Sequence, residues 1–153
     1  AAAKFVFLPE NFAALASQDP LAIGSDEISA SGPIRSFLRE VAEGHNCWLF
    51  AGTFPVVSRP DGSVVSGDRV RAASLVLNPL GEEVGRYDKI HMFDVAVDDN
   101  QGSYFESKVF EPGENVVTVN CPLGEAFAPV VVPPGNVIGI VGSSENIHVA
   151  VAI

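Results

Sequence analysis

The pattern of apolar and polar positions predicts two buried strands in the first third of the chain. Residues 5–8 and 47–53 are continuous apolar runs, which are typical of strands covered on both faces. The polar stretch 17–30 between them predicts a loop, and residues 11–16 suit a short helix. A longer helix follows that loop, so the order strand, helix, strand predicts an α/β sheet with a right-handed crossover.

The longer helix is predicted from an apolar stripe with helical spacing. The stripe consists of Ile34, Phe37, Leu38 and Val41. Pro33 suits the first helical turn, and Gly44 suits the residue just after the last one. We expect the opposite face to be exposed, and its polar residues are Arg35, Arg39, Glu40 and Glu43.

The rest of the chain has the pattern of short, mostly antiparallel strands. Residues 72–78 and 82–87 flank the turn Pro79-Leu80-Gly81, which predicts a hairpin. An acidic loop, too long for a simple connector, runs from Asp94 to about Ser103. Short strands separated by Pro, Gly and Ser are expected at residues 116–119, 130–132, 137–141 and 147–153.

Composition narrows the class of protein. The 153 residues include 19 acidic and 9 basic ones, a formal net charge of −10. A duplex nucleic-acid binder or a polybasic membrane-surface protein needs the opposite balance. With 47% hydrophobic and 18% charged residues, the chain is unlike a disordered one, and no apolar run reaches the ~20 residues of a membrane span. We therefore expect a soluble globular protein with neither nucleic acid nor membrane as partner.

The two ends and the cysteines add two further expectations. The chain begins with Ala1 rather than Met and ends in an apolar, strand-like run, whereas complete domains usually end in polar, frayed segments. We therefore expect a piece of a longer protein. The two cysteines are too few for a disulfide scaffold and suit a reducing, cytoplasmic compartment. Cys47, inside an apolar run, is predicted to be a buried structural thiol.

Candidate chemistry begins with two charged residues that follow predicted strands. Glu10 and Lys89 both lie just past a strand, where α/β sheets form their sites. Together they could act as general base and oxyanion-stabilising cation, or separately as a helix cap and a solvated charge. The three histidines are scattered and no phosphate-binding glycine loop occurs, so we expect no metal and no cofactor.

Several strings resemble one enzyme superfamily. Residues 7–12 (FLPENF) resemble the first catalytic motif of the nitrilase, or carbon–nitrogen hydrolase, superfamily, and residues 85–94 (GRYDKIHMFD) resemble the second. Further segments are similar to its Nit-type amidase branch, the omega-amidases and deaminated-glutathione amidases, and these are residues 48–55, 103–107 and 110–114. The resemblance covers residues 1–124 in the expected order and spacing.

The resemblance implies a fold and a chemistry. The fold would be α/β, with residues 1–124 as the N-terminal half of a four-layer α-β-β-α sandwich and residues 125–153 as a divergent, β-rich tail that does not match the family. The activity would be hydrolysis of a small linear amide, without a cofactor, in a homo-oligomer. By motif position, Glu10 would be the general base, Lys89 the oxyanion-stabilising cation and Glu106 a supporting carboxylate.

The third motif of the superfamily, which carries the nucleophilic cysteine, is missing after Gly124. Cys121 aligns with the hairpin before that motif, so we expect it to be structural. The nearest echo is residues 137–145, which would put Ser143 at the nucleophile position. Two functions therefore stay open: amide hydrolysis through Glu, Lys and Cys, impaired here, or a non-catalytic fragment or pseudoenzyme that binds carboxylate-bearing amides.

Overall fold

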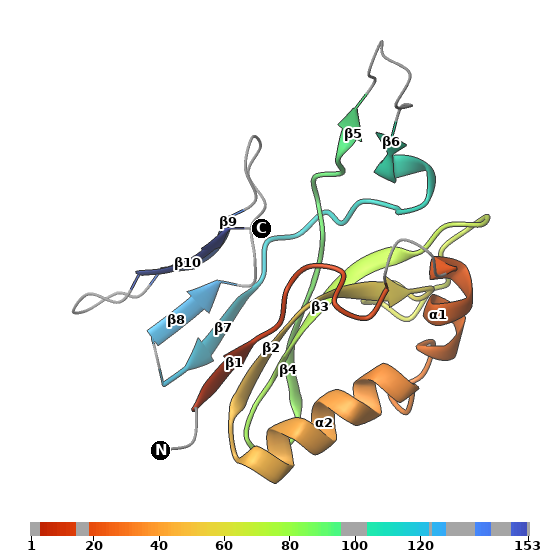
Figure 1. The fold of residues 1–153 in the computed structure, drawn as a ribbon. Coiled ribbons are helices and arrows are strands. Elements are labelled where there is room, and N and C mark those ends of the chain that lie inside the picture. The colour runs from red at the N-terminus through yellow and green to blue at the C-terminus, as the bar shows by residue number, and fades with distance from the viewer. Residues whose placement is uncertain are drawn as a thin grey trace.

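A four-stranded mixed sheet forms the centre of the computed structural model, which describes residues 4–14, 19–95, 104–122, 124–127, 137–141 and 148–152 (Figure 1). The sheet order is β1-β2-β3-β4, and its strands are β1 (Phe5–Phe7), β2 (Trp48–Val56), β3 (Arg71–Leu77) and β4 (Glu83–Asp88). β1 pairs parallel with β2, whereas β3 pairs antiparallel with both β2 and β4. The edge strands β1 and β4 therefore run in the same direction, and their carboxyl ends lie at the same end of the sheet. The predicted α/β class and the predicted hairpin are confirmed.

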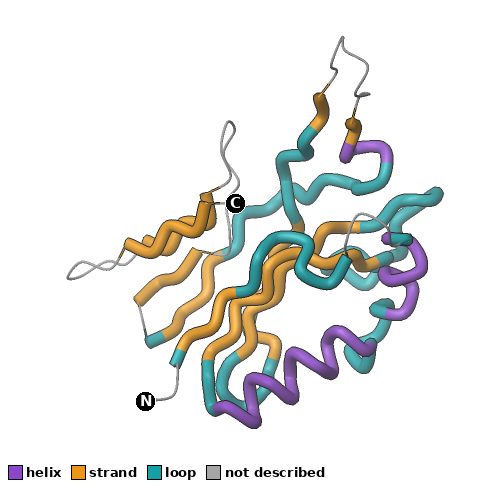
Figure 2. The backbone as a smooth tube through the Cα atoms, viewed as in Figure 1, coloured by secondary structure: helices purple, strands orange, loops and turns teal. Residues whose placement is uncertain are grey.

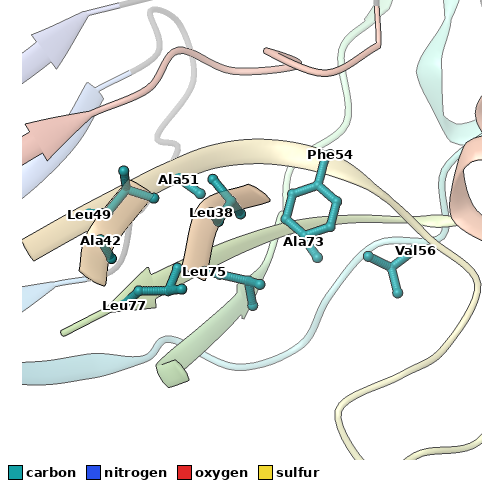
Figure 3. Packing of buried hydrophobic residues seen from close by; sticks show 9 residues of the cluster. All are labelled: Leu38, Ala42, Leu49, Ala51, Phe54, Val56, Ala73, Leu75 and Leu77. Carbon is teal, nitrogen blue, oxygen red and sulfur yellow. The ribbon is translucent and has the colours of Figure 1, made fainter. Parts of the chain in front are cut away.

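One face of the sheet is covered by the helix α2 (Pro33–His45), which lies along it in Figure 2. Helix and sheet enclose a core in which no side chain is more than 1% exposed (Figure 3). Burying a leucine in such a core stabilises the fold by about 1.5–3 kcal/mol. The core residues are Leu38, Ala42, Leu49, Ala51, Phe54, Val56, Ala73, Leu75 and Leu77.

The helix α2 differs from its predicted form in two ways. It continues through Gly44 and is capped by Asn46. The φ of Asn46 is 48°, a left-handed conformation that glycine adopts most often at helix ends and asparagine adopts sometimes. Arg35, expected on the exposed face, is buried, whereas Phe37 is 55% exposed. The buried Arg35 side chain has two acidic partners, because its Nη1 donates to Glu83 Oε2 at 2.5 Å and its Nε lies 3.9 Å from Glu27 Oε2. Glu27 also accepts hydrogen bonds from the backbone N–H groups of Ile34 and Arg35.

A second helix lies inside the stretch predicted to be a loop. α1 spans Pro20–Asp26, and the Asp19 side chain caps it by accepting hydrogen bonds from the backbone N–H groups of Leu21 and Ala22. Gly24 lets α1 lie close to the end of β2, because a Cβ there would be 3.2 Å from the backbone nitrogen of Val57. The earlier helix suggested for residues 11–16 is a turn at residues 11–13, and residues 15–18 are outside the described part.

β2 contains a β-bulge that matters for the site described below. Phe50 pairs with Val76 and Thr53 with Ser74, so Ala51 and Gly52 together oppose one residue of β3. The Ser74 hydroxyl donates a hydrogen bond of 2.6 Å to the carbonyl oxygen of Ala51, which compensates for the interrupted ladder. The bulge shifts by one residue the alternation of side chains between the two faces of the sheet. Phe54 therefore faces the core between the sheet and α2, and Thr53 faces the opposite side of the sheet.

The remaining elements are short. β5 (Asp94–Val95) pairs with β6 (Tyr104–Phe105), and a 3₁₀ turn, η1 (Glu106–Lys108), follows β6. β7 (Thr118–Cys121) pairs with β8 (Gly124–Phe127), and β9 (Val137–Val141) pairs with β10 (His148–Ala152). Strands are therefore confirmed near 137–141 and 147–153, β7 begins later than predicted, and the run 130–132 is outside the described residues.

β7 packs on the face of the sheet that α2 leaves open. Its residue Val119 joins a second buried cluster with Phe50 and Val76. No helix in the described part of the chain is long and apolar enough to cross a membrane.

Candidate active site

Glu10, Lys89 and Glu106, the three charged residues carried over from the motifs, lie in direct contact. The Lys89 Nζ donates to Glu10 Oε1 at 2.6 Å and to both carboxylate oxygens of Glu106 at 2.8 Å. The lysine side chain is 4% exposed and that of Glu106 is 10% exposed, whereas that of Glu10 is 20% exposed. The three N–H bonds of the ammonium group are therefore satisfied by two carboxylates, one of which is partly open to solvent.

Glu10 is held where the chain leaves β1 and crosses the bulge in β2. A Cβ on Gly52 would lie 1.7 Å from the carbonyl oxygen of Pro9, so only glycine permits this crossing. Asn11, with φ of 55°, donates its backbone N–H to the Thr53 hydroxyl at 2.9 Å. Glu10 is thus fixed on both sides by two consecutive residues of β2.

Lys89 is held by backbone bonds on both sides of its Cα. Its N–H donates to the carbonyl oxygen of Ala72 on β3 at 2.9 Å, and its carbonyl oxygen accepts from the N–H of Gly113 at 2.8 Å. Gly113 lies against Asp88, the residue before Lys89, since a Cβ on Gly113 would be 2.2 Å from the carbonyl oxygen of Asp88. The lysine therefore starts from a rigid position at the carboxyl end of β4.

Glu106 is held by the backbone of Phe93. The N–H of Phe93 donates to Glu106 Oε2 at 2.6 Å, and the Phe93 carbonyl oxygen accepts from the N–H of Glu106 at 3.2 Å. The same carboxylate oxygen receives a bond from Lys89. Both oxygens of Glu106 are thus engaged, which favours one orientation of this carboxylate.

A cavity of about 350 Å³ lies beside the three charged residues. Its lining combines their side chains with aromatic and small residues, which are Asn11, Thr53, Ala72, Phe93, Tyr104 and Phe110. The rings of Phe93 and Tyr104 are 61% and 57% exposed, with centroids 6.2 Å apart. The volume suits a small molecule with one polar end at Lys89 and an apolar part beside these rings.

Lys89 keeps its positive charge at neutral pH. Burial by itself lowers the pKa of the ammonium group, but the hydrogen bonds to Glu10 and Glu106 outweigh burial and raise the pKa above its ordinary value. The site thus presents an ammonium group that is charged at neutral pH and bound by two carboxylates.

Neither described cysteine lies in this cavity. Cys47 is fully buried just before β2, roughly 20 Å along the strand from Thr53. Cys121 packs against the buried cluster of Phe50, Val76 and Val119, on the face of the sheet that α2 leaves open. The structural role expected for Cys47 agrees with this burial, and Ser143 lies outside the described residues. In the described part of the chain, no group of His, Cys, Asp and Glu could hold a metal ion.

The sequence pattern does not identify several residues of the site. The apolar pattern of residues 47–53 does not reveal the bulge, so the roles of Gly52 and Thr53 could not be predicted. A glycine inside a strand was the available signal, because such a glycine often marks a bulge or a close backbone approach. The aromatic lining by Phe93 and Tyr104 had no signal beyond their proximity to the motifs.

Comparisons with known proteins agree with the fold and with the motifs. Residues 1–142 match the carbon–nitrogen hydrolase family. The chain is 39% identical to a deaminated glutathione amidase of Yersinia enterocolitica over 93 residues, which are 61% of this chain and 31% of that protein. It is 30% identical to the omega-amidase NIT3 of Saccharomyces cerevisiae over 124 residues, 80% of this chain and 40% of that protein.

A solved structure gives the same result. The crystal structure of Saccharomyces cerevisiae Nit3, described as a member of branch 10 of the nitrilase superfamily, matches with a TM-score of 0.59 and 26% identity. The match covers 80% of this chain and 40% of that one, so the chain spans well under half the length of these relatives. The predicted partial nitrilase-type fold is confirmed. This chain belongs to the carbon–nitrogen hydrolase family.

Proposed function

We propose that this chain carries the glutamate–lysine part of a site that hydrolyses a small linear amide. The observation that carries the proposal is the buried Lys89 ammonium group, bound by Glu10 and Glu106 beside a cavity. Membership of the carbon–nitrogen hydrolase family supports amide hydrolysis in general, and the amidases among the relatives support an amide as substrate.

In this proposal Lys89 stabilises the oxyanion that forms when a nucleophile attacks the amide carbon. Its raised pKa keeps the ammonium group charged at neutral pH. Two of its three N–H bonds go to the two oxygens of Glu106. One of them can therefore pass to the oxyanion while the other still holds Glu106, so the lysine stays oriented during the reaction.

Glu10 is the general base in this proposal. It takes the proton of the attacking nucleophile and gives it to the leaving nitrogen as the carbon–nitrogen bond breaks and ammonia departs. Glu10 then takes a proton from water, whose oxygen attacks the acyl carbon, and returns this proton to the nucleophile as the acyl–enzyme bond breaks and the acid is released. Its 20% exposure gives it the access to the cavity that these transfers need.

The nucleophile decides how active this chain is on its own. Neither Cys47 nor Cys121 is among the residues that line the cavity. Ser143 is our candidate for the nucleophile position, and a serine hydroxyl lacks the accessible anion of a thiol. We therefore expect slow hydrolysis by this chain alone.

The same observation favours a second candidate, a non-catalytic protein that binds amides. In a carboxylate-bearing amide, the group bound by Lys89 is then the amide carbonyl rather than the carboxylate. The single Lys89 ammonium group already faces the carboxylates of Glu10 and Glu106, so a third carboxylate would add a further uncompensated negative charge to a buried site. The neutral carbonyl oxygen needs only one shared N–H bond.

Ammonia release from an omega-amide such as α-ketoglutaramate tests the first candidate. Replacing the base with Glu10→Gln is expected to slow turnover by about 10²–10⁴-fold. Lys89→Ala should abolish turnover, and Glu40→Gln, which removes an exposed carboxylate on α2, should change nothing. Turnover that survives both Glu10→Gln and Lys89→Ala would refute the assignment.

Amide binding separates the second candidate from the first. If the chain releases no ammonia but saturation-transfer NMR detects amide binding that Lys89→Ala abolishes, the chain is a binding protein. If neither turnover nor such binding occurs, both candidates fail.

A further inference from the structure

Glu111 binds three arginines close to the candidate active site. Its carboxylate accepts bonds from Arg59 Nε at 2.7 Å and Arg59 Nη2 at 3.0 Å, from Arg69 Nη2 at 3.4 Å and from Arg71 Nη2. The hydrogen bond from Arg59, assisted by Arg71, outweighs burial and lowers the pKa of Glu111 to about 2. This carboxylate is therefore ionised at neutral pH.

The arginines already donate to acceptors within the protein, so we do not assign an anion-binding site to this cluster. It borders a cavity of about 580 Å³, but the remaining nitrogen of Arg59 donates to the Ser63 hydroxyl and the Val64 carbonyl oxygen. Arg86 is bound to Asp88 and to the Ser58 carbonyl oxygen. The undonated Nε of Arg71 lies 3.9 Å from Asp88 Oδ2. These internal bonds indicate that the role of the cluster is structural.

The backbone around Glu111 connects the arginine cluster to Lys89 and Glu106. The N–H of Glu111 donates to the Val70 carbonyl oxygen at 2.8 Å, and the N–H of Val70 donates to the Val109 carbonyl oxygen at 3.0 Å. The segment 106–113 thus runs beside the start of β3, with Glu106 at its beginning. Its end contacts the lysine directly, through the bond from Gly113 to the Lys89 carbonyl oxygen.

We propose that Glu111 is a positioning residue, which fastens segment 106–113 to β3 through Arg71 and to the loop after β2 through Arg59, and thereby keeps Glu106 on the Lys89 ammonium group. The inference deepens the proposed function, in which Glu106 orients the oxyanion-binding lysine. Glu111 does not itself contact Lys89, so in this proposal it acts through Glu106.

The ammonium signal of Lys89 tests this proposal without any turnover. The chain has three lysines, Lys4, Lys89 and Lys108, so lysine labelled with ¹⁵N at the side chain gives a simple NMR spectrum. Lys4 and Lys108 are exposed, whereas Lys89 is buried and fully hydrogen-bonded. Slow proton exchange should therefore give Lys89 an ammonium cross-peak of its own at neutral pH.

Four proteins make a double-mutant cycle: the parent chain, Glu111→Gln, Glu106→Ala and the combination of both. Glu111→Gln should remove or shift the Lys89 cross-peak in the parent chain and have no further effect in the Glu106→Ala background. Glu40→Gln is the matched control for loss of one carboxylate charge and should leave the signal in place.

Two results would overturn the proposal. One is an unchanged Lys89 cross-peak in folded Glu111→Gln, and the other is an equal effect of that change in both backgrounds, which would mean that Glu111 acts independently of Glu106. If Glu111→Gln loses the folded backbone spectrum, Arg59→Gln replaces it, because it removes two bonds to Glu111 from a partly exposed side chain. The same two results then decide. Because no reaction is measured, failure of this proposal is separate from failure of the proposed amidase function.

Discussion

Gly52 shows how strongly one small residue controls the geometry of the site. The carbonyl oxygen of Pro9 occupies the space that a side chain at position 52 would need. The next residue in the chain after Pro9 is Glu10, which reaches Lys89 at 2.6 Å. A methyl group at Gly52 would therefore push away the very segment that carries the candidate general base.

We predict that Gly52→Ala destabilises the protein and loosens the site. Overpacking of this kind costs about 1–3 kcal/mol, measured by urea unfolding. Gly44→Ala is the matched control, because that glycine lies within α2 and a Cβ there meets nothing within 4 Å. The control should stabilise by about 0.5–1 kcal/mol, since alanine suits a helix better than glycine. Equal effects of the two substitutions would contradict this account.

Among single residues, the sequence identifies the charged residues of the site better than the residues that hold them in place. Glu10, Lys89 and Glu106 could be chosen from motif resemblance, and the structure brings all three together, although their catalytic roles stay predictions. The supports are Gly52, Thr53 and Gly113, whose importance depends on which backbone lies against them. A glycine inside a strand is a local signal for Gly52, but which backbone segment lies against it is tertiary information that no local pattern contains.

At the scale of elements, the bulge in β2 links the core to the site. It lets one strand present Phe54 to the helical core and Thr53 to the opposite side, where Thr53 binds the backbone of Asn11. The bulge is stabilised by the buried hydroxyl of Ser74, which satisfies the carbonyl oxygen of Ala51. An unpaired buried carbonyl would cost about 1–3 kcal/mol.

We therefore predict that Ser74→Ala destabilises the protein by about 1–3 kcal/mol in urea unfolding. Ser36→Ala is the control, because the Ser36 hydroxyl makes a weaker, solvent-exposed bond of 3.3 Å to the Ser31 carbonyl oxygen. The control should change stability by less than about 0.5 kcal/mol. A Ser74 variant as stable as the Ser36 variant would show that the bulge does not need this hydroxyl.

The helices show where an apolar pattern is sufficient and where it is not. α2 was predictable because it is long enough for its stripe to repeat, although the buried Arg35 has its acidic partners, Glu27 and Glu83, outside the helix. α1 has only 7 residues, too few for a stripe. Its signal was the pair Asp19-Pro20, a cap followed by a proline at the first helical position.

At the scale of the whole molecule, the two faces of the sheet are covered unequally. α2 and the core cover one face, whereas the other carries the short strand β7 and a smaller cluster around Phe50. Large apolar side chains remain exposed in the described part, among them Phe37, Leu80, Val84, Phe93, Tyr104 and Val116. The boundary at residue 124 stays a prediction, and the family match continues to residue 142.

We predict that the chain associates with itself when it is produced alone. Burying its exposed apolar groups removes them from water, which is the usual driving force for such contacts. Sedimentation velocity over a range of concentrations should find dimers or larger species. A single monomeric species with a sharp, cooperative thermal transition would contradict the prediction.

The edge positions of β1 and β4 have a consequence for the order of folding. The bond between Lys89 and Glu10 joins residues 79 positions apart and bridges strands at opposite edges of the sheet. It can close only after β2 and β3 have paired between them, and such distant contacts form slowly. During refolding we therefore expect the backbone amides of the helix–sheet core to become protected from hydrogen exchange first. The ammonium–carboxylate cluster should form last, so that a compact species without this cluster precedes the native one.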